Sequence, residues 1–207
     1  MFTLIQKPET ELEYDNKIIK LKLWFNNVLL AYELFADQDF NELEKTEILF
    51  DMLCESKHKF ELEDKVKILE IIIKDIINNG KKNTNDKPSF NFKYDAEAIF
   101  SSFMQQYNIN LFEQHNKLWW HEFIALFIGL DDNTLIKKII NIRVKPLPKP
   151  TKHNKEEILN LQKLKAHYSL ANKMSEEELI KQEDKSKLQF FKTLENIANS
   201  NNEIIKK

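Results

Sequence analysis

The feature that most constrains this chain is an aromatic-rich stretch from residue 94 to residue 150. It is dense in apolar side chains, is broken at short intervals, and ends at Pro146, Pro148 and Pro150. Proline cannot continue a helix, so the last helix of the stretch must end before the first of them. A helix that is apolar around most of its circumference lies in a core or against a partner. The stretch therefore predicts a helical module that buries surface.

Three helices are expected in this stretch. The first covers residues 95–106, because Asp95 is a good N-cap and apolar residues follow at helical spacing. Asn108 and Asn110 interrupt it, since asparagine favours turns. The second covers residues 113–128 and closes at Gly129. Residues 131–134 (DDNT) then cap a third helix that carries the apolar residues of 135–142.

Six residues are the candidates for partner binding or for the core: Trp119, Trp120, Phe123, Phe127, Tyr107 and Arg143. Neighbouring helical residues point about 100° apart, so the two tryptophans serve two core layers, or one of them anchors a partner. Arg143 is the only arginine in the chain. It is either a buried residue that forms an ion pair or bidentate hydrogen bonds that lysine cannot reproduce, or a charge that interacts favourably with the dipole at a helix C-terminus.

The N-terminal part predicts a small β-hairpin followed by helices. Asp15-Asn16 is a turn dipeptide, and the residues after it alternate between lysine and aliphatic side chains, which is typical of a strand. Helical patterns follow at residues 24–36, 41–54 and 61–78.

Two polar, proline-containing segments, residues 80–93 and 145–154, are expected to be linkers, and helical patterns rich in Lys and Glu cover 155–171 and 175–199. The fold class is mainly α: a multi-helix bundle with an N-terminal hairpin and a helical C-terminal extension. The expected division is 1–79 for the hairpin and its helices, 80–93 for a linker, 94–147 for the helical core and 148–207 for the extension. The extension is either a solvated surface or an arm that orders on contact with a partner.

Composition excludes several classes of protein. The formal net charge is −2 with both signs mixed along the chain, which argues against nucleic-acid binding. The single Cys54 cannot form an intrachain disulfide and fits a reducing compartment. We expect no membrane span, because no apolar run reaches about 18–20 residues, and no secretion signal, because the first residues are acidic and lack an apolar core.

No metal site is expected. Cys54 and His58 are four residues apart, which would place them on one face of a helix, but a structural zinc site needs four ligands. His121-Glu122 matches a fragment of the zinc-hydrolase pattern, in which a second histidine follows the glutamate by three residues; Ala125 stands there. These residues are better explained as a buried thiol and surface or interface histidines.

No catalytic residue and no cofactor site are expected either. Asp131 and Asp132 form a carboxylate pair, yet adjacent acids before Asn-Thr are typical of a helix N-terminus. Two glycines in the whole chain exclude a glycine-rich nucleotide loop. We therefore expect a protein that is not an enzyme.

Several motifs of this sequence occur in order in one known family: YDAE at 94–97, QYNINL at 106–111, LWW at 118–120, Phe123, GL at 129–130, IINIR at 139–143 and LKAHYSL at 164–170. The set resembles the bacteriophage tail-assembly chaperones of the "gene product fifteen" type, encoded in siphophage tail modules near the tape measure gene. The hairpin-like opening is also similar. Asn108 and Asn110 depart from the pattern, since glycine and aspartate are expected there.

The resemblance implies a non-enzymatic chaperone that shields the tape measure protein during tail morphogenesis. It implies action in the cytoplasm of the bacterial host and absence from the mature virion. Self-association, or pairing with a second tail chaperone, is consistent with that role. The alternative is a structural tail or connector component that is retained in the virion. Neither function involves nucleic acid, a membrane or a cofactor.

Overall fold

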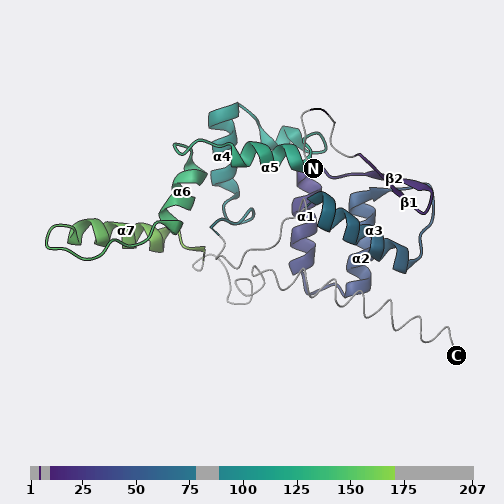
Figure 1. Cartoon of the computed structure of the whole chain (residues 1–207), viewed down its shortest axis with the longest axis horizontal. Helices are drawn as coiled ribbons and strands as arrows, with labels where there is room; N and C mark the ends of the chain where they lie inside the picture. Colours follow the sequence, from purple (N-terminus) through teal and green to yellow (C-terminus); the bar gives the residue numbers. More distant parts are fainter. Residues whose placement is uncertain (1–4, 6–9, 78–88, 171–207) are drawn as a thin grey trace. The chain divides into compact units, whose positions relative to one another are not determined.

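The computed structural model describes residues 10–77 and 89–170, together with Ile5. The described residues form seven α-helices and one small three-stranded antiparallel sheet (Figure 1), so the predicted mainly α class is confirmed. They divide into two compact units. Residues 10–77 and 115–124 belong to the first unit, and residues 89–114 and 125–170 belong to the second. The predicted helix over 175–199 lies outside the described residues.

The predicted hairpin is present in the first unit. Strands β1 (Glu11–Tyr14) and β2 (Lys17–Leu21) pair antiparallel, with Tyr14 opposite Lys17. Asp15 and Asn16 both have positive φ, at 51° and 55°, which is the backbone that a two-residue turn needs to match the twist of the strands. A third strand that the sequence did not indicate, β3 (Cys54–Glu55), pairs with β2. Along β2, buried and exposed side chains alternate, so one face of the strand supplies the core.

Helices α1 (Phe25–Ala36), α2 (Glu42–Leu53) and α3 (Leu62–Ile71) complete the described N-terminal segment, close to the predicted bounds. Asn41 caps α2 through a reciprocal capping box with Glu44. The predicted third helix continues only as a π-helical segment, η1 (Ile72–Ile77). The largest fully buried side chains here come from β2, α2, α3 and η1, and include Ile19, Leu49, Leu53, Ile68 and Leu69.

The second unit contains α4 (Ala96–Tyr107), the 3-10 helix η2 (Leu111–Gln114), α6 (Leu135–Val144) and α7 (Lys155–His167). Helix α6 lies next to α4 and α7. Its contact with α4 includes a buried hydroxyl: Ser102 Oγ donates to the Ala98 carbonyl and accepts from the Ile136 backbone N–H. Residues 146–153 contain no helix or strand, as expected of a proline-containing connection. Helix α5 (Trp120–Ile128) starts in the first unit and ends in the second.

The single helix expected over 113–128 is wrong. The chain forms η2, then a turn in which Asn116 has φ of 58°, and only then α5. Tertiary hydrogen bonds hold the turn out of the helix, because Asn116 N–H donates to the side chain of Asn26 and the Leu118 carbonyl accepts from Phe25 N–H. Glu122 then closes the start of α5, since its carboxylate accepts from Trp119 N–H at 3.1 Å.

Asn108 ends α4 in the left-handed conformation, with φ of 53° and its N–H directed to the Met104 carbonyl. Replacing Asn108 with glycine should leave the free energy of unfolding equal or slightly higher, because glycine adopts this conformation without steric strain. Asn108→Val should lower it by about 1–2 kcal/mol. Urea unfolding of both variants checks this, with Gln105→Val on the exposed side of α4 as a control for β-branching. Equal stability of Asn108→Val and the wild type would contradict the expectation.

Burial raises the pKa of the Cys54 thiol to about 12, with a smaller opposing contribution from Lys22. The folded pKa lies above the ordinary value of 9.0, so the folded state holds its proton more tightly than the unfolded state. The stability from this group is complete below pH 9 and is lost as the pH rises towards 12.

Between pH 9 and 11, the free energy of unfolding should therefore fall more steeply in the wild type than in Cys54→Ala. The difference in slope should approach, at most, about 1.4 kcal/mol per pH unit. Urea unfolding at several pH values measures both slopes, and the comparison removes the contribution of other groups such as Tyr14 that titrate in this range. Parallel slopes would show that the thiol is not the group responsible.

Candidate functional site

The two adjacent tryptophans both pack against residues of the first unit, Trp119 half-buried and Trp120 buried. Trp119 lies against Trp24, with ring centroids 4.3 Å apart. Trp120 is 4% exposed and contacts Tyr32 and Phe123, at 5.8 Å in each case. The two rings therefore contact different neighbours, and Trp120 belongs to the core whereas Trp119 is half-buried.

Backbone hydrogen bonds connect this pair to the start of α1. Phe25 N–H donates to the Leu118 carbonyl at 3.0 Å, and Trp120 N–H donates to the Leu23 carbonyl at 2.9 Å. Trp24 and Trp119 form an antiparallel bridge between these bonds. Phe123 is fully buried and stacks on Phe25, with centroids 4.9 Å apart. Residues 118–123 thus complete the core of the first unit.

Phe127 and Tyr107 have a similar role in the second unit. Phe127 is buried between Phe90 and Phe92, with centroids 4.7 and 5.6 Å away. Residues 89–93, the end of the predicted linker, are thus partly packed. The Tyr107 hydroxyl donates to the Leu126 carbonyl at 3.0 Å.

Gly129 is not in the left-handed conformation that its position after α5 suggested. A Cβ there would stand 3.2 Å from the Tyr107 hydroxyl oxygen and 3.3 Å from the Ala125 carbonyl oxygen. The lack of a side chain permits this close approach. Gln106 then holds the turn, because its amide donates to the Gly129 carbonyl and accepts from Asp131 N–H.

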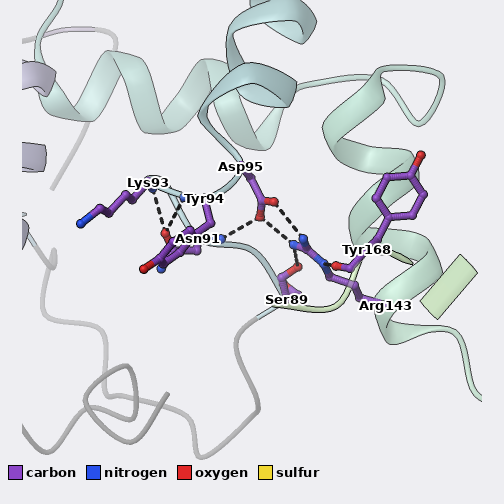
Figure 2. A network of polar contacts seen from close by, with 7 residues as sticks. All are labelled: Ser89, Asn91, Lys93, Tyr94, Asp95, Arg143 and Tyr168. Atoms are coloured by element: carbon purple, nitrogen blue, oxygen red, sulfur yellow. Dashed lines mark hydrogen bonds and ion pairs between the residues drawn. The ribbon is translucent and has the colours of Figure 1, made fainter. Parts of the chain in front are cut away.

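Arg143 and Asp95 form a buried ion pair, shown in Figure 2. The two guanidinium ends contact the two carboxylate oxygens at 2.6 and 2.8 Å. The arginine side chain is 9% exposed and the aspartate side chain 1%. The remaining guanidinium donors also have partners: Nε donates to the Tyr168 carbonyl at 2.6 Å and Nη1 to the Ser89 carbonyl at 3.1 Å. A single guanidinium therefore joins three separate segments of the second unit.

Asp95 does not cap α4 with its side chain, although it occupies the N-cap position and was expected to do so. Arg143 takes both carboxylate oxygens, and Asn91 N–H donates to one of them at 3.0 Å. Figure 2 also shows the turn that presents this N–H: the Asn91 side chain accepts from the backbone N–H groups of Lys93 and Tyr94. Lysine at 143 could not make the paired contact, because it lacks the planar fork of donors.

Among the described residues, no group of three or more His, Cys, Asp or Glu could hold a metal ion. The helical relation expected for Cys54 and His58 is wrong. Cys54 begins β3, and His58 lies in the loop that follows. Asp131 accepts from Asn133 N–H in a local turn before α6.

None of the described helices combines the length and the apolar composition that a membrane span requires.

The large apolar side chains that are exposed are not the six residues predicted for partner binding or for the core. Phe112 is 70% exposed, and its ring lies tilted against that of Phe100, with centroids 5.1 Å apart. Phe100 and Met104 stand one turn apart on α4, and Met104 is 37% exposed. We name Phe100, Met104 and Phe112 the aromatic patch. A sequence signal for it exists: both α4 residues fall outside the Ala98, Ile99 and Phe103 stripe that enters the core.

These features define a mainly α protein in which most of the predicted aromatic candidates pack in the cores. Other apolar side chains stay exposed on its surface, as in proteins that act by binding other proteins. The chain belongs to the bacteriophage Gp15 protein family, whose model matches residues 6–170. Membership makes it a phage structural or morphogenesis protein. No curated protein and no solved structure matches the chain.

Replacing Arg143 with alanine should lower the free energy of unfolding by about 3–5 kcal/mol, because Asp95 would be left buried without its counter-charge. Arg143→Lys should recover only part of the loss. Urea unfolding provides the measurement. The control is Lys138→Ala, which removes an exposed charge from the same helix and should change stability by less than about 0.5 kcal/mol. Similar stability of Arg143→Ala and the control would contradict a structural role for the pair.

Proposed function

We propose that this chain is a non-enzymatic tail-assembly chaperone that covers the tape measure protein until the tail tube encloses it. Membership of the bacteriophage Gp15 family supports a role in phage structure or morphogenesis. The observation that carries the finer proposal is the aromatic patch, an apolar surface on a chain whose other large aromatic candidates are mostly packed inside.

The chemistry of the patch suits a helical client. A long tape measure helix exposes an apolar stripe before the tube forms around it. Phenylalanine supplies apolar area, and the flexible methionine adapts to the irregular positions of successive client side chains. Phe100 and Met104 follow helical spacing on α4, so they present a row that can lie along an amphipathic helix.

The free energy that the aromatic patch can contribute favours reversible binding. Burying a side chain of this kind contributes about 1.5–3 kcal/mol. Three of them give at most ~5–9 kcal/mol before the entropic cost of association is subtracted. A single contact of this strength is weak, and it permits displacement by incoming tube subunits. Many copies on one client would raise the overall avidity without tighter individual contacts.

In this proposal, Trp119, Trp120, Phe123 and Phe127 act indirectly. Each of them packs within its own unit, and in this proposal none of them contacts the client. The chain works in the cytoplasm of the bacterial host and leaves before the virion matures. No turnover of any substrate is required, because the free energy of association and displacement suffices.

Co-expression with the tape measure protein of the same phage tests the proposal. The wild-type chain should keep the client soluble and elute with it. The double variant Met104→Ser/Phe112→Ser should lose most of the soluble client, because the apolar surface has gone while the buried core is untouched. The matched control is Ile18→Ser, which removes another exposed apolar side chain, on the hairpin.

A client that is equally insoluble with and without the wild-type chain, with no complex on elution, would overturn the proposal. Mass spectrometry of purified particles separates it from the alternative of a retained tail or connector component. A chaperone should be absent from the particles, whereas a component should be present in stoichiometric amounts.

A further inference from the structure

Charge is strongly segregated along this chain, although the formal total is only −2. Residues 135–170, which include α6 and α7, hold nine Lys or Arg and two Glu, a net charge of +7. Residues 33–55, from the end of α1 to β3, hold eight Asp or Glu and one Lys, a net charge of −7. The two signs of charge were expected to be mixed along the chain, but these two regions carry opposite net charges.

The basic region presents its charge to solvent together with apolar side chains. Its only arginine is buried in the pair with Asp95, so the exposed cations are all lysines. We name ten exposed lysine and apolar residues of this region the basic surface; Glu156 and Glu157, also exposed, are the region's only acids. Its members are Lys138, Val144, Lys145, Leu147, Lys149, Lys152, Lys155, Leu159, Lys163 and Leu164. On α7, Lys155, Leu159 and Lys163 follow at four-residue intervals and share one side of the helix.

The acidic region has the complementary composition. Its single lysine, Lys45, is buried near Glu42. Lys65 from the neighbouring helix α3 pairs with Glu47. We name six exposed acidic and apolar residues from the second half of α1, the connection and the first turn of α2 the acidic surface: Leu30, Glu33, Asp39, Phe40, Leu43 and Glu44. It combines exposed apolar side chains with carboxylates, as the basic surface combines them with lysines.

We propose that the basic surface of one copy docks on the acidic surface of a second copy of this chain. Each surface offers the charge that the other lacks, and both offer apolar side chains to bury between the charged rims. A nucleic acid would use the lysines but would leave the exposed leucines and valine in water.

The contact joins two different surfaces, so it is heterologous. Each added copy still offers one free surface of each kind, and the assembly is either a closed ring or an open array. This self-association does not depend on a client. If the proposed function holds, an open array gives a repeating row of chaperones along a long helical client, in which each copy contributes a weak contact.

Sedimentation velocity of the purified full-length chain tests the proposal. The average mass should rise with protein concentration. Raising the salt from about 0.05 M to about 0.5 M should weaken the association at least ~10-fold, because the charged rims are then screened. The variants Lys155→Glu/Lys163→Glu and Glu33→Lys/Asp39→Lys should each weaken self-association by at least ~10-fold.

The decisive measurement mixes these two variants. Each retains one intact surface, and the two intact surfaces are complementary, so the mixture should associate although neither variant does so alone. The control matched to Lys155→Glu/Lys163→Glu is Lys20→Glu/Lys59→Glu, which has the same change in charge at exposed positions outside both surfaces and should associate like the wild type. Circular dichroism checks that every variant is folded.

Three results would overturn the proposal: a wild-type chain that stays monomeric up to about 1 mM, variants that associate as well as the wild type, or a monomer that binds duplex DNA through the basic surface. The experiment contains no tape measure protein. Its failure would therefore leave the co-expression result standing, and failure of co-expression would leave self-association standing.

Discussion

The first unit depends on the backbone hydrogen bonds that join residues 23–25 to residues 118–120. They position Trp119 on Trp24 and direct Trp120 and Phe123 towards α1. They also explain why α5 starts where it does, because the N–H of its first residue is taken by the Leu23 carbonyl. Without this connection, α5, the most apolar of the described helices, would have no core to enter at its N-terminal end.

The second unit depends on a polar interaction. Burying a carboxylate and a guanidinium costs free energy that a well-packed apolar pair would avoid, so the pair is poor evidence for added stability. Its geometry suggests specificity as its role. Asp95 begins α4, Arg143 lies in the last turn of α6, and the remaining guanidinium donors reach Ser89 and Tyr168. An alternative register of these segments would leave a charge buried and unpaired.

Much of the fold could be predicted from local sequence patterns. The hairpin turn, α2 with its capping box, and the ends of α4 and α6 follow from residues adjacent to them. The turn at 115–117 could not be predicted in this way, because it is held by Asn26 and Phe25, which are distant in sequence. Strand β3 has only two residues and exists because β2 offers it partners. Asp95 was correctly predicted to occupy the N-cap position. Its ion pair with Arg143 was not predicted, since no local pattern indicates a partner on another helix.

The predicted site residues illustrate the same limit. Aromatic density identified Trp120, Phe123 and Phe127, and all three are buried. A segment rich in aromatic residues indicates that apolar surface must be buried, but it does not indicate where in the fold. The apolar residues that stay exposed, such as Phe112, Leu159 and Leu164, are unremarkable in sequence and became visible only when the packed faces were known.

The bond between Phe25 and Leu118 has a consequence for synthesis on the ribosome. The N-terminal helices emerge early, yet the residues that complete their core emerge only after the whole segment 89–114 of the second unit has been made. The apolar core of the nascent first unit therefore stays incomplete until those residues have been made. Closing this long loop is then a slow, late step in folding. A host chaperone that binds nascent chains would find its target there, before the core of the first unit is complete.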